Sequence, residues 1–306
     1  MRLGIAGCGR IAERGYVPAA LAAEGVSIAG FADPDAERRE GCRALWERGG
    51  DGDAVAVASV DELLEVPLDL LVVAVPAEHH LALAEQAAAA GVRCLVEKPP
   101  ALDLAEMERQ AALDPAPFLA FNRRFLQGAE LRDGIPAEGW LELDLELRFR
   151  RDAWGAHQSR DEALLDAGIH LIDLACHLSG SAPIAVRGAR VEPENGELEL
   201  ELARGRARIA FATDRNHREK VEVRDRAGKL IASSRWGGLR SRLSGLTGNT
   251  DPLVLSLQRQ LEALRNATPV AVAADGVTAM AVVEAARRSA ALGGAEVTVT
   301  PAEVHP

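Results

Sequence analysis

Cysteine is scarce in this sequence, and its few cysteines are widely separated. Cys8, Cys42, Cys94 and Cys176 include no C-x-x-C pair. A disulfide framework or a cysteine zinc site needs cysteines at close, regular spacing, so neither is expected. Free thiols in a reducing compartment fit the sequence better.

Long apolar runs and an excess of basic residues are also absent. No segment approaches the roughly 18 apolar residues that a membrane-spanning helix needs. The N-terminal apolar run is short and broken by glycine, unlike a secretory signal. The formal net charge of −11 disfavours nucleic acid and anionic membranes as partners, because both attract clustered Lys and Arg. We therefore expect a cytoplasmic protein that binds neither.

The first 121 residues alternate short apolar runs with helical patterns. The expected strands are residues 2–6, 26–32, 54–58, 68–75, 92–96 and 118–121. Apolar strands separated by helices are typical of a parallel sheet covered on both faces. This half is therefore expected to be an α/β domain of the Rossmann type, with a doubly wound parallel sheet.

After residue 121 the pattern changes to strict alternation. Residues 140–150 place leucine on one face and charge on the other, and residues 197–203, 206–212, 220–224 and 230–234 behave alike. Alternation of apolar and polar residues with a period of two predicts a mostly antiparallel open sheet with one solvent-exposed face, within an α+β domain. Helices are expected at 253–266 and 275–292. The solvent-exposed face of strand 140–150 could associate subunits into a homodimer or homotetramer.

A glycine motif follows the first expected strand. Gly7-Cys8-Gly9-Arg10-Ile11-Ala12 matches G-x-G-x-x-A, in which the glycines permit a tight turn and the close approach of a pyrophosphate. Asp33 lies 21 residues beyond Ala12 at the end of the second strand, where its carboxylate can bind an adenosine ribose. The residues expected to bind the cofactor here are Gly7, Gly9, Arg10, Ile11, Ala12 and Asp33.

Asp33 also bears on the choice between NAD and NADP. Its charge would repel a 2′-phosphate, so NAD is the expected cofactor. Arg38 and Arg39 follow closely and keep NADP open as a second interpretation.

The ends of the fourth and fifth strands add candidates at the same edge of the sheet, because the carboxyl ends of parallel strands face the cofactor crevice. Glu97-Lys98-Pro99 follows strand five, and a lysine there could exchange protons with a substrate oxygen. Pro76 and His80 follow strand four. We expect Pro76, His80, Glu97 and Lys98 beside the cofactor. The alternatives are a surface lysine held by Glu97 and a helix-start histidine without a ligand.

Residues 164–177 carry the most informative pattern. On an α-helix, Asp166, His170, Asp173 and His177 would share one stripe surrounded by hydrophobic residues. Such groups are costly to bury without partners, so the stripe indicates a site. No further ligand pattern supports a metal, and none is expected. The side chain of Trp154 either lines the pocket of this site or belongs to the hydrophobic core.

Taken in order, these motifs resemble those of a known family. The glycine motif, Asp33, the P-x-x-x-H of Pro76 and His80, Glu97-Lys98-Pro99, the junction Asn122-Arg123-Arg124-Phe125 and Asp166-x-x-x-His170 all occur. Together they resemble the Gfo/Idh/MocA family of NAD(P)-dependent oxidoreductases over essentially the whole chain. The resemblance implies a Rossmann domain at residues 1–121. It also implies a second domain at 122–306, whose open sheet often joins subunits.

The resemblance also implies an activity. The family usually oxidises or reduces sugars, inositols and related polyols at a secondary alcohol, and by position Lys98, Asp166 and His170 are the catalytic residues. His170 would remove the alcohol proton as hydride leaves, Lys98 would bind the developing oxyanion, and Asp166 would orient the lysine. The two proton-carrying roles are interchangeable at this stage. Arg124, Trp154 and Asp173 are candidates for substrate contact.

One segment departs from the family pattern. Two or three glycines normally precede the segment leading to the aspartate, and this chain has Arg160-Asp161-Glu162 instead. Ser159 and Glu162 match the S-x-x-E pattern of a capping box. Acidic residues there disfavour anions, so we expect a neutral or cationic substrate.

Three rival functions stay open. The first is a glycosidase or lyase that retains NAD and uses transient oxidation. The second is a cofactor-binding regulator without activity, suggested by the missing glycines. The third and weakest is a metal hydrolase built on the histidine and aspartate stripe.

Overall fold

The computed structural model describes residues 1–151, 162–237 and 251–300 and divides the chain into two compact units. The first unit comprises Met1–Asn122 and Asp251–Gly276, and the second comprises Arg123–Thr250 and Val277–Pro306. Among the helices of the described ranges, none combines the length and apolar character needed to cross a membrane.

A six-stranded parallel sheet forms the centre of the first unit. Its strands are β1 (Arg2–Ala6), β2 (Ser27–Ala32), β3 (Val55–Val57), β4 (Leu70–Val73), β5 (Cys94–Val96) and β6 (Phe118–Leu119). They lie in the order β3-β2-β1-β4-β5-β6, and every pair is parallel. This order is that of a Rossmann sheet and confirms the expected doubly wound fold.

Some helices of this unit begin at an aspartate cap. Asp35 caps α2 (Ala36–Glu47), and Asp103 caps α5 (Leu104–Ala111). Each carboxylate accepts backbone N–H groups that the first helical turn leaves unpaired. The other helices are a π-helical turn η1 (Ala12–Tyr16), α1 (Val17–Ala22), α3 (Val60–Leu64), a 3₁₀ turn η2 (Ala77–His79) and α4 (His80–Ala89).

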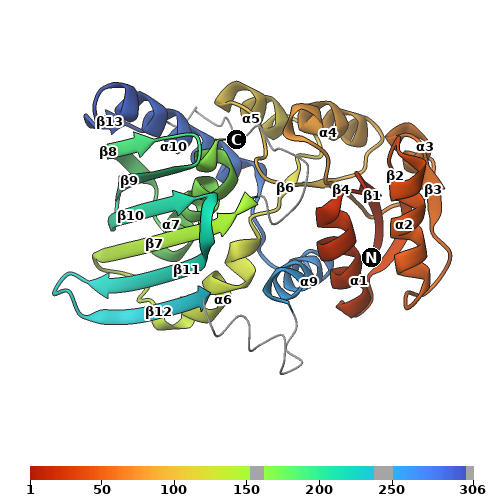
Figure 1. Cartoon of the computed structure of the whole chain (residues 1–306), viewed down its shortest axis with the longest axis horizontal. Coiled ribbons are helices and arrows are strands. Elements are labelled where there is room, and N and C mark those ends of the chain that lie inside the picture. The colour runs from red at the N-terminus through yellow and green to blue at the C-terminus, as the bar shows by residue number, and fades with distance from the viewer. Residues whose placement is uncertain (152–161, 238–250, 301–306) are drawn as a thin grey trace. The chain divides into compact units, whose positions relative to one another are not determined.

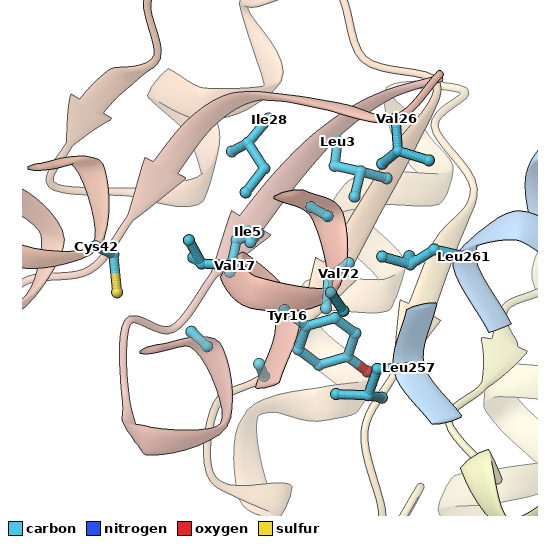
Figure 2. Close-up of a cluster of buried hydrophobic side chains, with 14 of the residues drawn as sticks. Leu3, Ile5, Tyr16, Val17, Val26, Ile28, Cys42, Val72, Leu257 and Leu261 are labelled. Atoms are coloured by element: carbon cyan, nitrogen blue, oxygen red, sulfur yellow. The ribbon is translucent and has the colours of Figure 1, made fainter. Parts of the chain in front are cut away.

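A segment distant in sequence completes the core of the first unit. Helix α9 (Pro252–Arg265) contributes Leu257 and Leu261 to the cluster that contains Leu3, Ile5 and Tyr16 (Figure 2). Both leucines are fully buried. The expected division at residues 121 and 122 placed this helix in the second domain. The structure differs there because the apolar face of α9 is buried against the first unit.

The second unit contains a seven-stranded sheet (Figure 1). Its strands are β7 (Leu141–Arg150), β8 (Pro183–Val191), β9 (Asn195–Leu202), β10 (Gly205–Ala212), β11 (Asp214–Asp225), β12 (Leu230–Gly237) and β13 (Val297–Thr298). The order is β12-β11-β7-β10-β9-β8-β13, with only the β7–β10 pair parallel among the pairs described. The expected open, mostly antiparallel sheet is confirmed.

The two faces of this sheet differ as the alternation predicts. Leu143, Leu145 and Leu147 of β7 are buried. The intervening Glu142 and Asp144 form ion pairs with neighbouring strands. Helix α7 (Ile169–Ser179) packs against β7 and ends at Gly180, which has a left-handed φ of 59°. A π-helical turn, η6 (Leu164–Gly168), leads into α7.

Four further helical segments lie in the described part of the chain after residue 121. They are the 3₁₀ turn η3 (Asn122–Phe125), helix α6 (Gln127–Leu131), the 3₁₀ turn η4 (Arg132–Gly134) and helix α10 (Ala273–Ala291). Helix α10 starts in the first unit and continues into the second.

Candidate functional site

The glycine loop between β1 and the first helix has two glycines with different roles. Gly7 has a φ of +92°, and a Cβ there would lie 2.4 Å from the carbonyl oxygen of Ala74, so no larger residue fits. At Gly9, an added Cβ would meet nothing within 4 Å. The backbone at Gly9 therefore borders open space, as the phosphates of a dinucleotide require. The loop leads directly into the π-helical turn η1, a feature frequent at functional sites.

Asp33 links this loop to the end of β2. Its Oδ2 accepts the backbone N–H of Cys8, and its Oδ1 accepts that of Asp35, both at 2.8 Å. The carboxylate is 8% exposed. Each carboxylate oxygen can accept a second hydrogen bond, so the residue is fixed in place and still able to bind a ribose diol.

The two arginines after Asp33 take different positions. Arg38 pairs with Asp35 at 3.4 Å on the surface. The Nη1 of Arg39 donates to the backbone carbonyls of Asp33 and Pro34, at 3.1 and 3.3 Å. Arg39 therefore holds the turn that follows β2.

Glu97 at the end of β5 is buried and serves as an anchor. Its Oε1 accepts the hydroxyl of Tyr16 at 2.7 Å, and its Oε2 accepts the backbone N–H of Lys98 at 3.0 Å. Burial raises the pKa of the Glu97 carboxyl and, together with the Glu97 charge, that of the Tyr16 hydroxyl. These bonds fix the backbone that carries Lys98 against the helical segment after the glycine loop.

His80 is buried at the start of α4. Its Nδ1 lies 3.0 Å from the carbonyl oxygen of Pro99, and its Nε2 lies 2.9 Å from that of Val75. The ring therefore ties together the segments that follow β4 and β5, just after Pro76, which caps η2. This geometry favours the expected alternative, a histidine with a structural role.

Asp166, His170 and Asp173 all lie buried in the helical segment of the second unit, with 6%, 5% and 3% exposure. Asp166 belongs to the π-helical turn η6 and His170 to α7, so the residues do not all lie on one regular α-helix. Asp166 pairs with Arg151, whose Nε and Nη2 both lie 3.0 Å from Oδ2. Arg151 was not predicted from the sequence, because nothing in the pattern after β7 indicates its partner.

Arg124 and Asp173, both expected to contact substrate, bind each other. The Nε of Arg124 donates to Oδ2 of Asp173 at 2.9 Å, and its Nη2 donates to Oδ1 at 2.5 Å. The Asp173 side chain is 1% exposed. A two-point pair this deeply buried anchors α7 to the turn η3.

Another buried carboxylate in this unit, Glu219, was not predicted from the sequence. Glu219 of β11 accepts hydrogen bonds from Arg123, Gln127 and His217. Burial would raise the pKa of Glu219, but the charge of Arg123 and the hydrogen bonds from His217 and Arg123 outweigh burial and lower it to about 2. Alternation along the strand does not reveal such a cluster, because its members come from separate segments.

The expected site residues thus form two sets, one in each unit. The first set contains the glycine loop, Asp33, Glu97 and Lys98, and the second contains Asp166 and His170. Trp154 and the expected capping residue Ser159 lie outside the described residues. Glu162 is described, and it pairs with Arg287 of α10 at 2.5 Å. Among the described residues, no group of three or more His, Cys, Asp or Glu lies close enough together to hold a metal ion.

Comparison with known proteins agrees with the fold. Residues 1–114 match the sequence model of the Gfo/Idh/MocA oxidoreductase family, described as having an NAD-binding Rossmann fold. The fold and the glycine loop define a dinucleotide-binding protein of the Rossmann class. More particularly, the first 114 residues match the Gfo/Idh/MocA family, in agreement with the resemblance that the motifs indicate. The expected cofactor, NAD, agrees with the family description.

Curated relatives and solved structures extend the comparison. An oxidoreductase named YceM from Salmonella typhimurium is 29% identical over 205 residues, which cover 65% of this chain and 62% of that protein. A UDP-N-acetylglucosamine 3-dehydrogenase from Acidithiobacillus ferrooxidans is 29% identical over 210 residues, 66% of this chain and 62% of that protein. The matched regions thus span about three fifths of each relative (62%).

The structure of a myo-inositol dehydrogenase from Corynebacterium glutamicum has the same fold. It matches with a TM-score of 0.74 at 22% identity and covers 99% of each chain. The likeness therefore includes both units of the chain.

Proposed function

We propose that this protein is an NAD-dependent oxidoreductase that transfers a hydride between the nicotinamide and a secondary alcohol or ketone. The substrate is a sugar, an inositol or a related polyol. The observation that carries the proposal is the open backbone at Gly9 beside the fixed carboxylate of Asp33. The names of the relatives, which include dehydrogenases of sugars and inositol, support this substrate class.

The residues present fit the dinucleotide. Gly9 leaves the space that a pyrophosphate needs at the start of a helix, and Asp33 presents acceptors to the adenosine ribose. When bound, NAD supplies the hydride acceptor for alcohol oxidation. A 2′-phosphate would meet the charge of Asp33, so the proposal favours NAD over NADP.

The proton chemistry is assigned to this chain's own groups. His170 takes the proton of the alcohol as a general base, and Lys98 stabilises the developing oxyanion by a hydrogen bond. The ion pair with Arg151 holds the carboxylate of Asp166 in place. In this proposal Asp166 orients Lys98.

A substrate screen tests the proposal. Sugars, inositols and keto-sugars are offered with NAD and with NADP, and the absorbance of the reduced nicotinamide is followed. Lys98→Ala and His170→Ala should each strongly reduce turnover of the best substrate, with NAD binding by calorimetry nearly unchanged. Lys229→Ala, which alters an exposed lysine in the turn before β12, is the matched control.

Two results would contradict the assignment. Full activity in either variant would remove Lys98 or His170 from the chemistry. NAD that purifies with the protein, combined with no net NADH formation across the panel, would favour the NAD-retaining glycosidase or lyase instead.

A further inference from the structure

A hollow lies where β7, β11 and β12 run side by side in the second unit. It has a volume of about 630 Å³. Its lining includes Arg148, Arg215, His217, Arg218, Arg235 and Trp236. We call it the arginine hollow. All of its lining residues belong to the second unit and to the described part of the chain.

The strand register brings two of these arginines face to face. Arg218 of β11 is the direct partner of Arg148 of β7 in the antiparallel pair. Like charges at directly opposed positions destabilise a sheet. Glu146 offsets this cost, because its carboxylate pairs with both Arg148 and Arg218 and its side chain is only 8% exposed. A buried carboxylate thus holds two guanidinium groups in one place.

The same arrangement recurs at the neighbouring strand. Arg235 of β12 pairs through Nη2 with Glu222, whose side chain is 9% exposed and also pairs with Arg224. Trp236 follows Arg235 and adds an aromatic side chain to the lining. The carboxylates form a buried layer beneath the cations.

The atoms used in these pairs leave the outer ends of the side chains available. Arg148, Arg215 and Arg218 form their ion pairs through Nε. In each of these three pairs, Nε is the guanidinium atom that the structure places against the carboxylate. A guanidinium held by Nε presents its Nη donors outward, in the geometry that matches oxyanions such as phosphate.

We propose that the arginine hollow binds an oxyanion, the phosphate or diphosphate group of a small molecule. A small ligand fits the volume of the hollow, and the chain's net charge of −11 opposes a nucleic-acid backbone. The binding test below does not require the redox activity proposed above. If the phosphate is part of the substrate, the substrate is an anion and not the neutral or cationic molecule expected from the sequence. That expectation rested on acidic residues of which Glu162 is paired with Arg287.

Calorimetry with pyrophosphate and with inorganic phosphate tests the proposal at constant ionic strength. Because pyrophosphate could also bind the glycine loop, each titration is run on the wild type and on Gly9→Asp, which places a carboxylate in that loop. We expect one site that survives Gly9→Asp and whose affinity falls at least about tenfold in Arg148→Gln or Arg218→Gln.

Arg206→Gln is the matched control. Arg206 pairs with Glu142 on the same sheet and does not line the hollow. Circular dichroism and thermal melting confirm that each variant is folded, and Arg218→Lys should retain part of the affinity if the variant with glutamine unfolds. Binding that is lost in Gly9→Asp but kept in Arg218→Gln would overturn the proposal. Absence of pyrophosphate binding would also overturn it.

A second arm identifies the source of the phosphate. Steady-state kinetics compare a sugar with its phosphate ester in the wild type and in Arg218→Gln. A KM raised only for the ester supports a phosphate carried by the substrate. Equal kinetics, together with retained pyrophosphate binding in the wild type, support a separate phosphate ligand. Failure of all turnover would count against the oxidoreductase proposal and leave the calorimetric result intact.

Discussion

At the scale of single residues, the least expected feature is the arginine beside Asp166. Arg151 places two nitrogens 3.0 Å from one carboxylate oxygen of Asp166. A pair of this kind both fixes a carboxylate and keeps it ionised. Arg151 is therefore a positioning residue in the proposed reaction, acting through Asp166.

Arg151→Gln tests this role. We expect kcat to fall by about tenfold to a hundredfold, because the carboxylate of Asp166 loses the group that orients it. KM should change less than kcat. Arg151→Lys should restore part of the activity, and Arg190→Gln, which alters an exposed pair with Glu197, is the control. An unchanged kcat in Arg151→Gln would contradict the role.

Glu219 provides one pH-dependent contribution to stability. Its pKa of about 2 in the folded protein is lower than the ordinary value of 4.5. A lowered pKa means that the ionised form stabilises the fold. This stabilisation is present above the ordinary value and is lost as the pH falls from 4.5 to about 2.

Glu219→Gln should therefore remove part of the acid sensitivity. Urea unfolding over a series of pH values should show a free energy of unfolding that falls less steeply below the ordinary pKa than in the wild type. Glu142→Gln, which alters a more exposed partner of Arg206, is the comparison. Parallel curves for wild type and Glu219→Gln would refute the assignment.

At the scale of elements, the buried pair Arg124–Asp173 fastens α7 to the turn η3. Arg124→Ala would leave the Asp173 carboxylate buried without its main partner, and we expect a loss of about 3–5 kcal/mol in the free energy of unfolding. Replacing both, as Arg124→Met with Asp173→Leu, should recover most of this loss. Chemical denaturation measures both effects. A double variant as unstable as Arg124→Ala would show that more than the unpaired charge is responsible.

The elements also show what the sequence could and could not predict. β1 matches its predicted range, because apolar runs in a parallel sheet are bounded by glycine and by helix caps. β8 was missed, because register shifts between Pro183 and Ala185 and between Arg187 and Arg190 break its alternation. The π-helical turn η6 was expected to be α-helical, since both helices present similar apolar patterns over one turn.

The sequence indicates candidate site residues but not their partners. Local signals reveal Gly7, Gly9 and Asp33, because turn geometry and strand ends depend on neighbouring residues. Arg151 and Glu219 were not predicted, because their partners come from other segments and pairing across the fold leaves no local pattern.

At the scale of the whole molecule, association through the open sheet stays a prediction. The face opposite the buried leucines carries ion pairs between strands, including Arg187–Glu199, Arg206–Glu142 and Lys220–Asp144. Contacts through such a face depend on charge and are screened by salt.

We therefore expect a homodimer or homotetramer whose dissociation increases between about 0.1 and 1 M salt. Light scattering across that range measures the mass directly. Arg206→Glu, which reverses one charge on this face, should also favour the monomer. An oligomer of unchanged mass in Arg206→Glu and at high salt would place the subunit contact elsewhere.

The return of α9 to the first unit has a consequence for how the chain reaches its native state. Leu257 and Leu261 are translated long after η1 and α1, against which α9 packs. A ribosome that has released only residues 1–122 therefore presents a first unit with an uncovered apolar patch. A fragment cut at that point should aggregate, whereas the same fragment linked to residues 251–276 should stay in solution.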